Sequence, residues 1–294
     1  TLGFSVQDYS HDLMTEEALN WITANRDQAM FLYLAYCIPH THWQVPELGE
    51  YAEKDWPEER FKVQAAMVSR MDRDIGRIKR LLEELGIEED TLLIFNSDNG
   101  AHGQGGTREF FDTTGGLKGK KRLMTEGGVR SPMLAYWPGK VPAGTHSEHI
   151  SAFWDILPTM AELAGEPING RTDGLSMLPT LIREYEQQKE HRYLYWELYE
   201  GRPNCGVRMG KWKGLVQDRR KGMEIELYDL DADEAEERNV AHQYPEVVDQ
   251  IRKAMLEAHE PSAFWDKNNK PLYNAQAACD LNAVTYVPRL KKKN

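Results

Sequence analysis

The 294-residue chain has few cysteines, no long apolar run and no excess of basic charge, and each absence excludes a class of protein. Its three cysteines, Cys37, Cys205 and Cys279, are too sparse for a disulfide framework or a zinc knuckle. No stretch approaches the roughly 20 consecutive apolar residues with which a helix spans a bilayer. The net charge of −11, from 36 basic and 47 acidic residues, argues against nucleic acid as a partner, because phosphate binding needs a dominant basic face.

Alternating apolar strands and amphipathic helices predict an α/β layer fold in the first two thirds of the chain. The predicted strands are short, continuously apolar runs typical of strands buried on both faces of a largely parallel sheet, at 31–36, 91–95 and 133–136. The predicted helices show apolar residues at spacings of three and four, over 16–25, 57–85 and 151–163.

The pattern changes near residue 190. Four short segments with tight spacing predict an antiparallel meander, at 193–196, 206–209, 212–215 and 225–228. Pro245 begins a further predicted helix that runs to His259. We therefore predict a large α/β domain over 1–188, a smaller antiparallel α+β subdomain with a packed helix over 189–260, and a C-terminal extension over 261–294.

Residues 95–130 carry the side chains most suited to chemistry. Asp98 and Asn99 follow a predicted strand, and Gly100 lets the chain turn so that both side chains face one ion. Oxygen ligands of this kind suit Ca²⁺ or Mg²⁺, and open α/β sheets bind ligands beyond the carboxyl ends of their strands. The structural alternative is an Asx-type turn that only ends the strand.

A cluster of cations follows at 118–122, where four of five residues are basic. Lys121 is the candidate anion ligand, because it stands five residues before Glu126-Gly127-Gly128, whose glycines permit unusual dihedrals and close backbone approach. A lysine ammonium is a compact point charge suited to a tetrahedral oxyanion. The alternative is a solvated basic loop.

Histidines and aromatic residues complete the candidate site. His40 follows the predicted strand at 31–36, so parallel strands would place it on the same edge as Asp98, as a general acid or an anion ligand. A structural hydrogen bond is the alternative role, and His42 could replace it. Candidates for lining a substrate pocket, which are as often structural, are His42, Trp43, His102, Asp112 and Trp196.

The candidate site has no nucleophile. The chain contains no Gly-x-Ser-x-Gly motif, and Cys37 and Cys205 have no neighbouring base in the sequence. A metal, a histidine and a lysine around an anion would bind it and stabilise a transition state, so these residues predict half of a hydrolytic site.

The ordered set of motifs from about residue 9 to 260 resembles the sulfatase family, the arylsulfatase-like branch of the alkaline phosphatase superfamily. The resemblance implies an alkaline-phosphatase-like mixed sheet flanked by helices, plus a small C-terminal antiparallel sheet with a packed helix. The matching stretches are Tyr9–Ala18, Phe31–Pro46, Leu93–Gly100, Gly119–Arg122, Glu126–Pro132, Tyr136–Gly139, Asp155–Thr159, Val207–Lys213 and Leu227–Leu230.

That resemblance implies hydrolysis of sulfate esters, of a sulfated carbohydrate or an aryl sulfate, with Ca²⁺ or less often Mg²⁺. Asp98 and Asn99 would be metal ligands, and His40 and Lys121 would contact the sulfate. The family's nucleophile is a formylglycine made from a Cys-x-Pro-Ser-Arg-type motif, and an aspartate pair completes the metal site. Neither is in this chain, so we expect both before Thr1, and we expect the chain alone to be inactive.

Two alternative functions remain open at this point. One is a phosphoester or phosphonate hydrolase of the same superfamily, and the other is a non-catalytic protein that binds sulfated glycans on a decayed sulfatase fold. An unpaired sheet edge would favour association with a partner or a second copy of the chain. The resemblance implies a periplasmic, secreted or lysosomal location.

Overall fold

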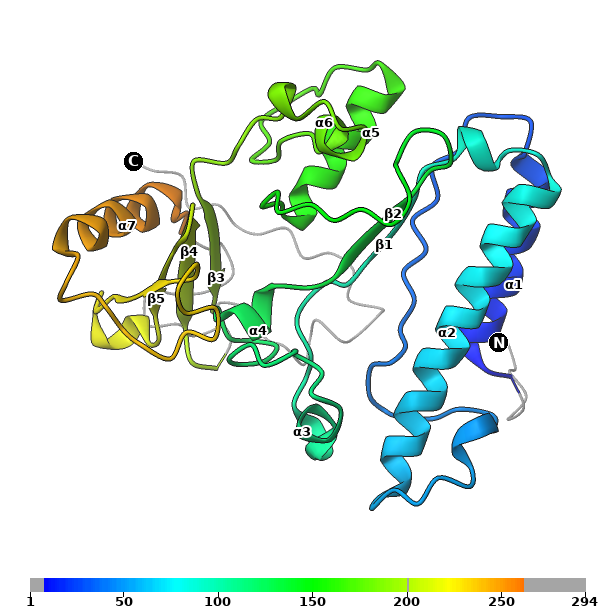
Figure 1. Cartoon of the computed structure of the whole chain (residues 1–294), viewed down its shortest axis with the longest axis horizontal. Coiled ribbons are helices and arrows are strands. Elements are labelled where there is room, and N and C mark those ends of the chain that lie inside the picture. The colour runs from blue at the N-terminus through cyan, green and yellow to red at the C-terminus, as the bar shows by residue number, and fades with distance from the viewer. Residues whose placement is uncertain (1–7, 200, 262–294) are drawn as a thin grey trace, which may run out of the picture.

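The computed structural model describes residues 8–199 and 201–261, and within them the chain forms two antiparallel sheets, β1-β2 and β3-β4-β5-β6 (Figure 1). The predicted extension at 261–294 falls, except for Pro261, outside the described residues. The helices and strands are α1 (Ser10–Asn25), α2 (Glu59–Glu84), β1 (Leu93–Asn96), α3 (Thr107–Phe111), α4 (Glu126–Val129), β2 (Met133–Tyr136), α5 (Ile156–Ala164), α6 (Leu178–Leu181), β3 (Leu194–Leu198), β4 (Asn204–Met209), β5 (Trp212–Val216), β6 (Glu226–Asp229) and α7 (Pro245–Ala258).

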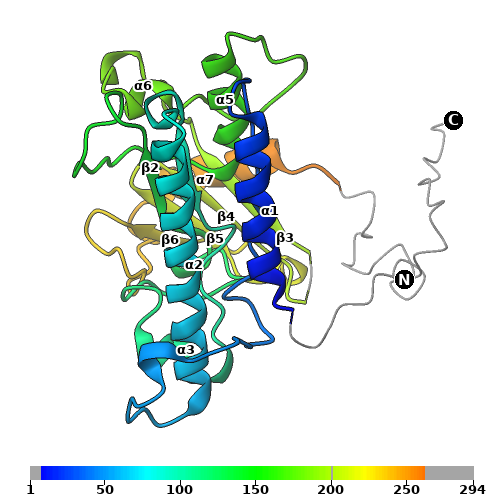
Figure 2. The same cartoon turned by 90° about the vertical axis from the view of Figure 1, so that its right-hand side faces the viewer.

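The first two long helices, α1 and α2, lie side by side along one flank of the molecule (Figure 2). Both predictions are confirmed, although α1 begins six residues before the predicted start at 16. Ile22 packs against Ile78 and Leu82, and all three are buried. A buried hydrogen bond also joins the two helices, with the imidazole Nε2 of His11 3.0 Å from Asp74 Oδ2.

The predicted strand at 31–36 is wrong. This segment joins no sheet among the described residues, and Phe31, Leu32 and Tyr33 are 66%, 41% and 69% exposed. The strands predicted at 91–95 and 133–136 do form, as β1 and β2, but they pair antiparallel with each other. A strand needs a neighbour for its N–H and C=O groups, so an apolar run without one stays extended chain.

The helix predicted at 151–163 forms as α5, which begins at Ile156, five residues after the predicted start. Asp155 explains the delay, because its buried carboxylate accepts the N–H of Ala152 at 2.7 Å and organises a single tight turn before the α-helix. The same carboxylate accepts the N–H of Leu175 at 2.8 Å and contacts His191 Nε2 at 2.9 Å. These bonds tie the α5 region to the segment that leads into β3.

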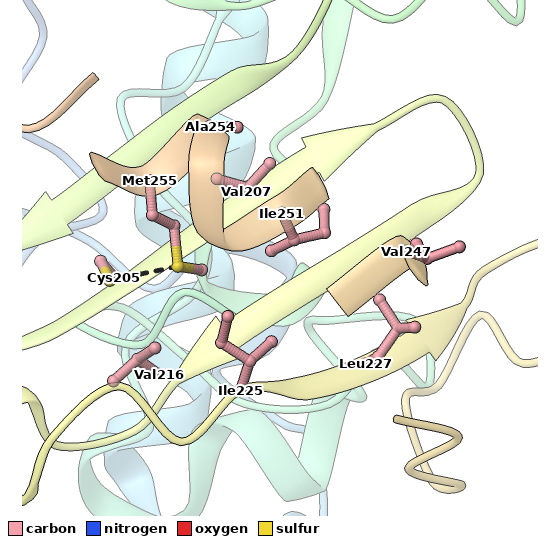
Figure 3. Packing of buried hydrophobic residues seen from close by; sticks show 9 residues of the cluster. All are labelled: Cys205, Val207, Val216, Ile225, Leu227, Val247, Ile251, Ala254 and Met255. Atoms are coloured by element: carbon pink, nitrogen blue, oxygen red, sulfur yellow. Dashed lines mark hydrogen bonds between the residues drawn. The ribbon is translucent and has the colours of Figure 1, made fainter. Parts of the chain in front are cut away.

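The predicted meander is confirmed as β3 to β6, and α7 covers one face of this sheet (Figure 3). Val207, Leu227 and Ile251 are fully buried at the centre of that contact. Gly214 lets the helix approach closely, since a Cβ at this position would lie 2.3 Å from Ile251 Cγ2. These elements fall within the predicted 189–260 subdomain, and the division into domains itself remains a prediction.

A buried ionic junction joins the C-terminal sheet to the loops that follow β1. Lys213 of β5 has no exposed side-chain surface, and its Nζ donates to Glu126 Oε1 of α4 at 2.6 Å. The backbone N–H of Glu126 donates to Glu236 Oε2 at 2.8 Å, and Lys118 Nζ donates to the Glu236 carbonyl at 2.7 Å. The Lys213 ammonium also lies 5.1 Å from the centre of the Trp196 ring. Three chain segments therefore meet at one buried charge network.

We expect Gly214→Ala to destabilise the C-terminal subdomain by about 1–3 kcal/mol, because the new methyl group overpacks against Ile251. Urea unfolding followed by circular dichroism measures the change. Gly76→Ala in α2 is the matched control, since its nearest neighbour would be Arg80 Nη1 at an ordinary 3.5 Å and alanine is a better helix former. Equal stability of the two variants would contradict the close packing described for Gly214.

We also expect the stability of the protein to depend on pH through the carboxyl group of Glu236. Burial raises the pKa of the Glu236 carboxyl to about 7, against the opposing effects of the Glu126 N–H and the Lys213 charge. The folded state therefore holds this proton more tightly than the unfolded chain, and stability falls as pH rises from about 4.5 to about 7. We expect Glu236→Gln to remove about 3 kcal/mol of this pH dependence.

Urea unfolding at pH 5 and pH 8 measures the difference for wild type, Glu236→Gln and the control Glu237→Gln, whose side chain is exposed. The control should keep the wild-type pH dependence. The same pH dependence in all three proteins would show that Glu236 ionises normally in the folded state.

Candidate functional site

Backbone hydrogen bonds hold the end of β1 against the basic loop and α4. The N–H of Gly100 donates to the Gly128 carbonyl at 2.9 Å, and the N–H of Lys121 donates to the Ala101 carbonyl at 3.0 Å. Main-chain bonds of this kind fix position more firmly than contacts between flexible side chains. Lys121 is therefore held beside the turn that carries Asp98, although the two residues are far apart in the sequence.

Three glycines make this close approach feasible. A Cβ at Gly100 would lie 2.0 Å from the Gly127 carbonyl oxygen, and one at Gly128 would lie 2.0 Å from the Leu123 carbonyl oxygen. A Cβ at Gly127 would lie 2.6 Å from the Lys118 carbonyl oxygen. Gly127 and Gly128 both lie in a helix, so neither needs the unusual dihedrals that the sequence suggested. Close backbone approach is the reason for glycine at both positions.

Asp98, Asn99 and Lys121 line one cavity of about 530 Å³. The opposite wall comes from β3 and includes Trp196 and Glu197. The structure thus brings together both predicted metal ligands, the predicted anion ligand and one predicted substrate-lining residue. The cavity lies where the C-terminal sheet meets the loops that follow β1.

The polar atoms of this cavity suit a hard cation beside an anion. Asp98 is exposed, and neither its carboxylate nor the Lys121 ammonium bonds to any residue that the structure describes. The Asn99 amide nitrogen donates to the Gly100 carbonyl at 3.3 Å, which leaves its side-chain oxygen available. A carboxylate and an amide oxygen fit Ca²⁺ or Mg²⁺, and because Ca²⁺ takes six to eight oxygens they supply part of a shell.

The described residues include no group of three or more histidine, cysteine, aspartate or glutamate side chains arranged to hold a metal. Asp98 and Asn99 would therefore supply two of the ligands of a calcium site. Further ligands have to come from backbone oxygens, solvent, substrate or other parts of the protein.

His102 lies in the positive field of the basic loop, and His40 is close enough to contribute to it. His40 Nδ1 is 2.6 Å from the Thr41 carbonyl oxygen, which only accepts, so Nδ1 carries the proton and Nε2 is free to act. Partial desolvation lowers the pKa of His102, which favours the neutral form of this ring. The further causes are repulsions from neighbouring groups, namely Lys121, Lys120, Arg122 and His40.

The predicted parallel strand before His40 is wrong among the described residues, yet His40 lies close enough to His102 to lower the pKa of that ring. Neither histidine lines the cavity itself. Their catalytic and substrate-binding roles remain predictions.

The other predicted pocket residues lie outside the cavity. His42 is exposed, and the Trp43 ring covers Gly105, with Cζ3 3.1 Å from where a Cβ would stand. Asp112 ends α3 in a left-handed conformation, and its carboxylate accepts the N–H of Gly116 at 3.0 Å. That bond gives Asp112 a structural task in a turn, and a role in substrate binding remains a prediction.

Two cysteines had been set aside as nucleophiles, and the structure gives a physical reason for one of them. Cys205 is 1% exposed, and burial raises the pKa of its thiol to about 11. The thiol therefore stays protonated at neutral pH and is a poor nucleophile. Cys37 is exposed on the loop before His40.

The sequence did not reveal the polar cluster behind the β3 wall. Glu197 Oε2 accepts hydrogen bonds from Tyr195 at 2.6 Å, Arg219 at 2.6 Å and His259 at 2.9 Å. Arg219 and His259 are 22 and 62 residues away from Glu197, so no local pattern connects them. The cluster ties the Glu197 carboxylate of β3 to Arg219 and to His259, which directly follows α7.

The sequence analysis also did not single out Lys213 as a buried charge, although the alternation along β5 indicates it. Alternation along β5 places Lys213 on the same face as Leu215, which is 2% exposed. A lysine at an inward-facing strand position indicates a buried carboxylate partner elsewhere in the chain.

Comparison with known proteins finds matches over most of the chain. A family model described as Sulfatase matches residues 2–166, and one described as N-sulphoglucosamine sulphohydrolase, C-terminal, matches residues 117–261. Human arylsulfatase A is 32% identical over 207 residues, covering 70% of this chain and 38% of that protein. Mouse N-acetylgalactosamine-6-sulfatase is 32% identical over 209 residues, covering 68% of this chain and 37% of that protein.

Among solved structures, Ps i-CgsB in complex with k-i-k-neocarrahexaose is 29% identical, with a TM-score of 0.74 over 87% of this chain and 56% of that one. This likeness confirms the predicted alkaline-phosphatase-like fold. The chain spans a little over a third of the length of the curated relatives named here, 38% and 37%. Because the Sulfatase model alone matches more than half of its residues, this chain belongs to the sulfatase family.

Proposed function

We propose that this chain provides the metal- and sulfate-binding half of a sulfuric ester hydrolase. The observation that carries the proposal is the shared cavity of Asp98, Asn99 and Lys121, two oxygen ligands and one cation that the backbone holds together. A sulfate ester needs a cation for its charged oxygens and stabilisation of the charge that develops on the leaving oxygen. Lys121, and a metal ion held by Asp98 and Asn99, would supply the positive charge for the sulfate oxygens.

Each residue has a defined task in this proposal. The Lys121 ammonium binds a sulfate oxygen, and Asp98 and Asn99 hold a Ca²⁺ ion, which, when bound, offsets the charge of the sulfate and of the nucleophile. His40 keeps its Nδ1 proton on the Thr41 carbonyl, so a proton for the leaving oxygen would come from Nε2 of the doubly protonated ring. The attacking group is the formylglycine of the family, which residues outside this sequence would contribute.

A sulfated carbohydrate is the substrate class that we propose. Trp196 in the cavity wall is an aromatic residue whose ring is in contact with the Lys213 ammonium, at 5.1 Å, and with Trp154, whose ring centre is 5.8 Å away. The names of related proteins support this choice, since one is an N-acetylgalactosamine-6-sulfatase and another was solved with a neocarrahexaose. An aryl sulfate would meet the same wall and serves as a convenient assay substrate.

Family membership favours sulfate over phosphate esters and gives the phosphoesterase alternative no support. A non-catalytic glycan-binding role is tested by the same experiments, because it predicts binding without turnover. No helix among the described residues is long and apolar enough to cross a membrane. A periplasmic, secreted or lysosomal location remains part of the proposal.

We expect Lys121→Gln in the full-length protein to lower kcat/KM for an aryl sulfate by about 100- to 1,000-fold, because a charged contact to the reacting group is lost. The comparison variant is Lys140→Gln, an exposed lysine after β2 that should leave turnover unchanged. Turnover is followed by release of the phenol. Full activity in Lys121→Gln, or a wild-type preference for phosphate over sulfate esters, would overturn the proposal.

Removal of Ca²⁺ with a chelator should abolish turnover of the full-length protein, and added Ca²⁺ should restore it. Asp98→Asn removes one charged ligand, so we expect calcium affinity measured by calorimetry to fall by at least about tenfold. Asp173→Asn, an exposed aspartate far along the chain, is the matched control and should bind calcium normally. Unchanged calcium affinity in Asp98→Asn would exclude Asp98 as a ligand.

A further inference from the structure

A second cationic surface, formed by Arg108 and Lys120, lies beside the candidate site. Both side chains pass over the bare backbone of Gly103. A Cβ at that glycine would lie 3.1 Å from Lys120 Cδ, 3.6 Å from Lys120 Nζ and 3.7 Å from Arg108 Cδ. The two side chains thus converge on one small patch, although one comes from α3 and the other from the basic loop.

The charges of this surface are not neutralised by the protein. Neither the Arg108 guanidinium nor the Lys120 ammonium makes a hydrogen bond or an ion pair with any residue in the described part of the chain. Other arginines of the chain do pair with carboxylates, as shown by Arg60, Arg70, Arg77 and Arg130. In a protein with 47 acidic and 36 basic residues, two converging cations without a carboxylate indicate an external anion.

This surface adjoins the proposed sulfate site through the peptide bond between Lys120 and Lys121 and through His102. Lys120 is the neighbour of Lys121, and His102, next to Gly103, feels both charges, because each contributes to lowering its pKa after desolvation. Trp43 lies over Gly105, two residues beyond Gly103, so an aromatic face borders the same loop. A ligand anchored by its sulfate at Lys121 can therefore present a neighbouring group to Lys120 and Arg108.

We propose that Arg108 and Lys120 bind a second anionic group, a sulfate or a carboxylate, on the same glycan whose ester sulfate lies at Lys121. The planar guanidinium matches the paired oxygens of either group, and the lysine adds a point charge. The preferred substrates are then glycans with at least two acidic groups. This inference rests on the proposed function and narrows its substrate class.

Calorimetry on the full-length protein tests it with three ligands: N-acetylgalactosamine 6-sulfate, its 4,6-disulfate, and a disaccharide that joins the 6-sulfated sugar to a uronate. We expect Arg108→Gln/Lys120→Gln to weaken binding of one or both dianionic ligands about three- to tenfold while monosulfate binding stays unchanged. Selective loss with the disulfate identifies a sulfate subsite, and selective loss with the uronate identifies a carboxylate subsite.

Arg108→Lys/Lys120→Arg keeps both charges and should retain most of the affinity, whereas Lys140→Gln should bind all three ligands normally. Thermal melting of each variant checks that it is folded, and the single variants Arg108→Gln and Lys120→Gln carry the test if the double glutamine variant is not. Equal weakening of all three ligands, or no weakening of either dianionic ligand, would overturn the inference.

The outcomes for the two proposals can be told apart. Lys121→Gln should weaken all three ligands if the proposed function is correct. If Lys121→Gln weakens all three ligands but Arg108→Gln/Lys120→Gln has no selective effect on the dianionic ligands, only the proposal of a second anion site is ruled out. Failure of every ligand to bind the wild-type protein removes both.

Discussion

The buried pair of Glu126 and Lys213 is the constraint on which the rest of this structure depends. A buried charge is tolerated only when it is paired and hydrogen bonded, and here both partners are sealed from solvent. Glu126 heads the short helix beside the basic loop, and Lys213 comes from the middle of the C-terminal sheet. Removing either partner would leave the other charge buried without compensation, so the pair fixes how these two parts of the molecule meet.

The candidate site follows from that contact. Asp98 and Lys121 belong to the loops on one side, while Trp196 and Glu197 belong to the sheet on the other. The Lys213 ammonium that neutralises Glu126 also lies over the Trp196 ring, so one buried cation connects the anchoring pair to the cavity wall. A substitution at Glu126 or Lys213 should therefore alter the cavity wall, although neither residue lines the cavity.

Much of the fold could be predicted from sequence because its signals are local. The helices α2 and α7 and all four strands of the C-terminal sheet appear where periodicity predicts them. The segment at 31–36 has the same apolar character as β1 but forms no strand among the described residues, because pairing depends on a neighbour that no local pattern encodes. The parallel arrangement expected for the first sheet was wrong for the same reason, since β1 and β2 pair antiparallel.

The sequence by itself determined the chemistry of the site: an acid–amide pair after a strand, a lysine before Glu126-Gly127-Gly128, and the glycines that close approach requires. Only the tertiary structure decided which of these groups share a cavity and which partners hold them. It placed Asp112 in a turn and Lys213 in the buried ion pair with Glu126, and it brought Arg108 next to Lys120. The physical reason is that side-chain type is written residue by residue, whereas the distance between residues far apart in the chain is set by packing and buried charge pairing.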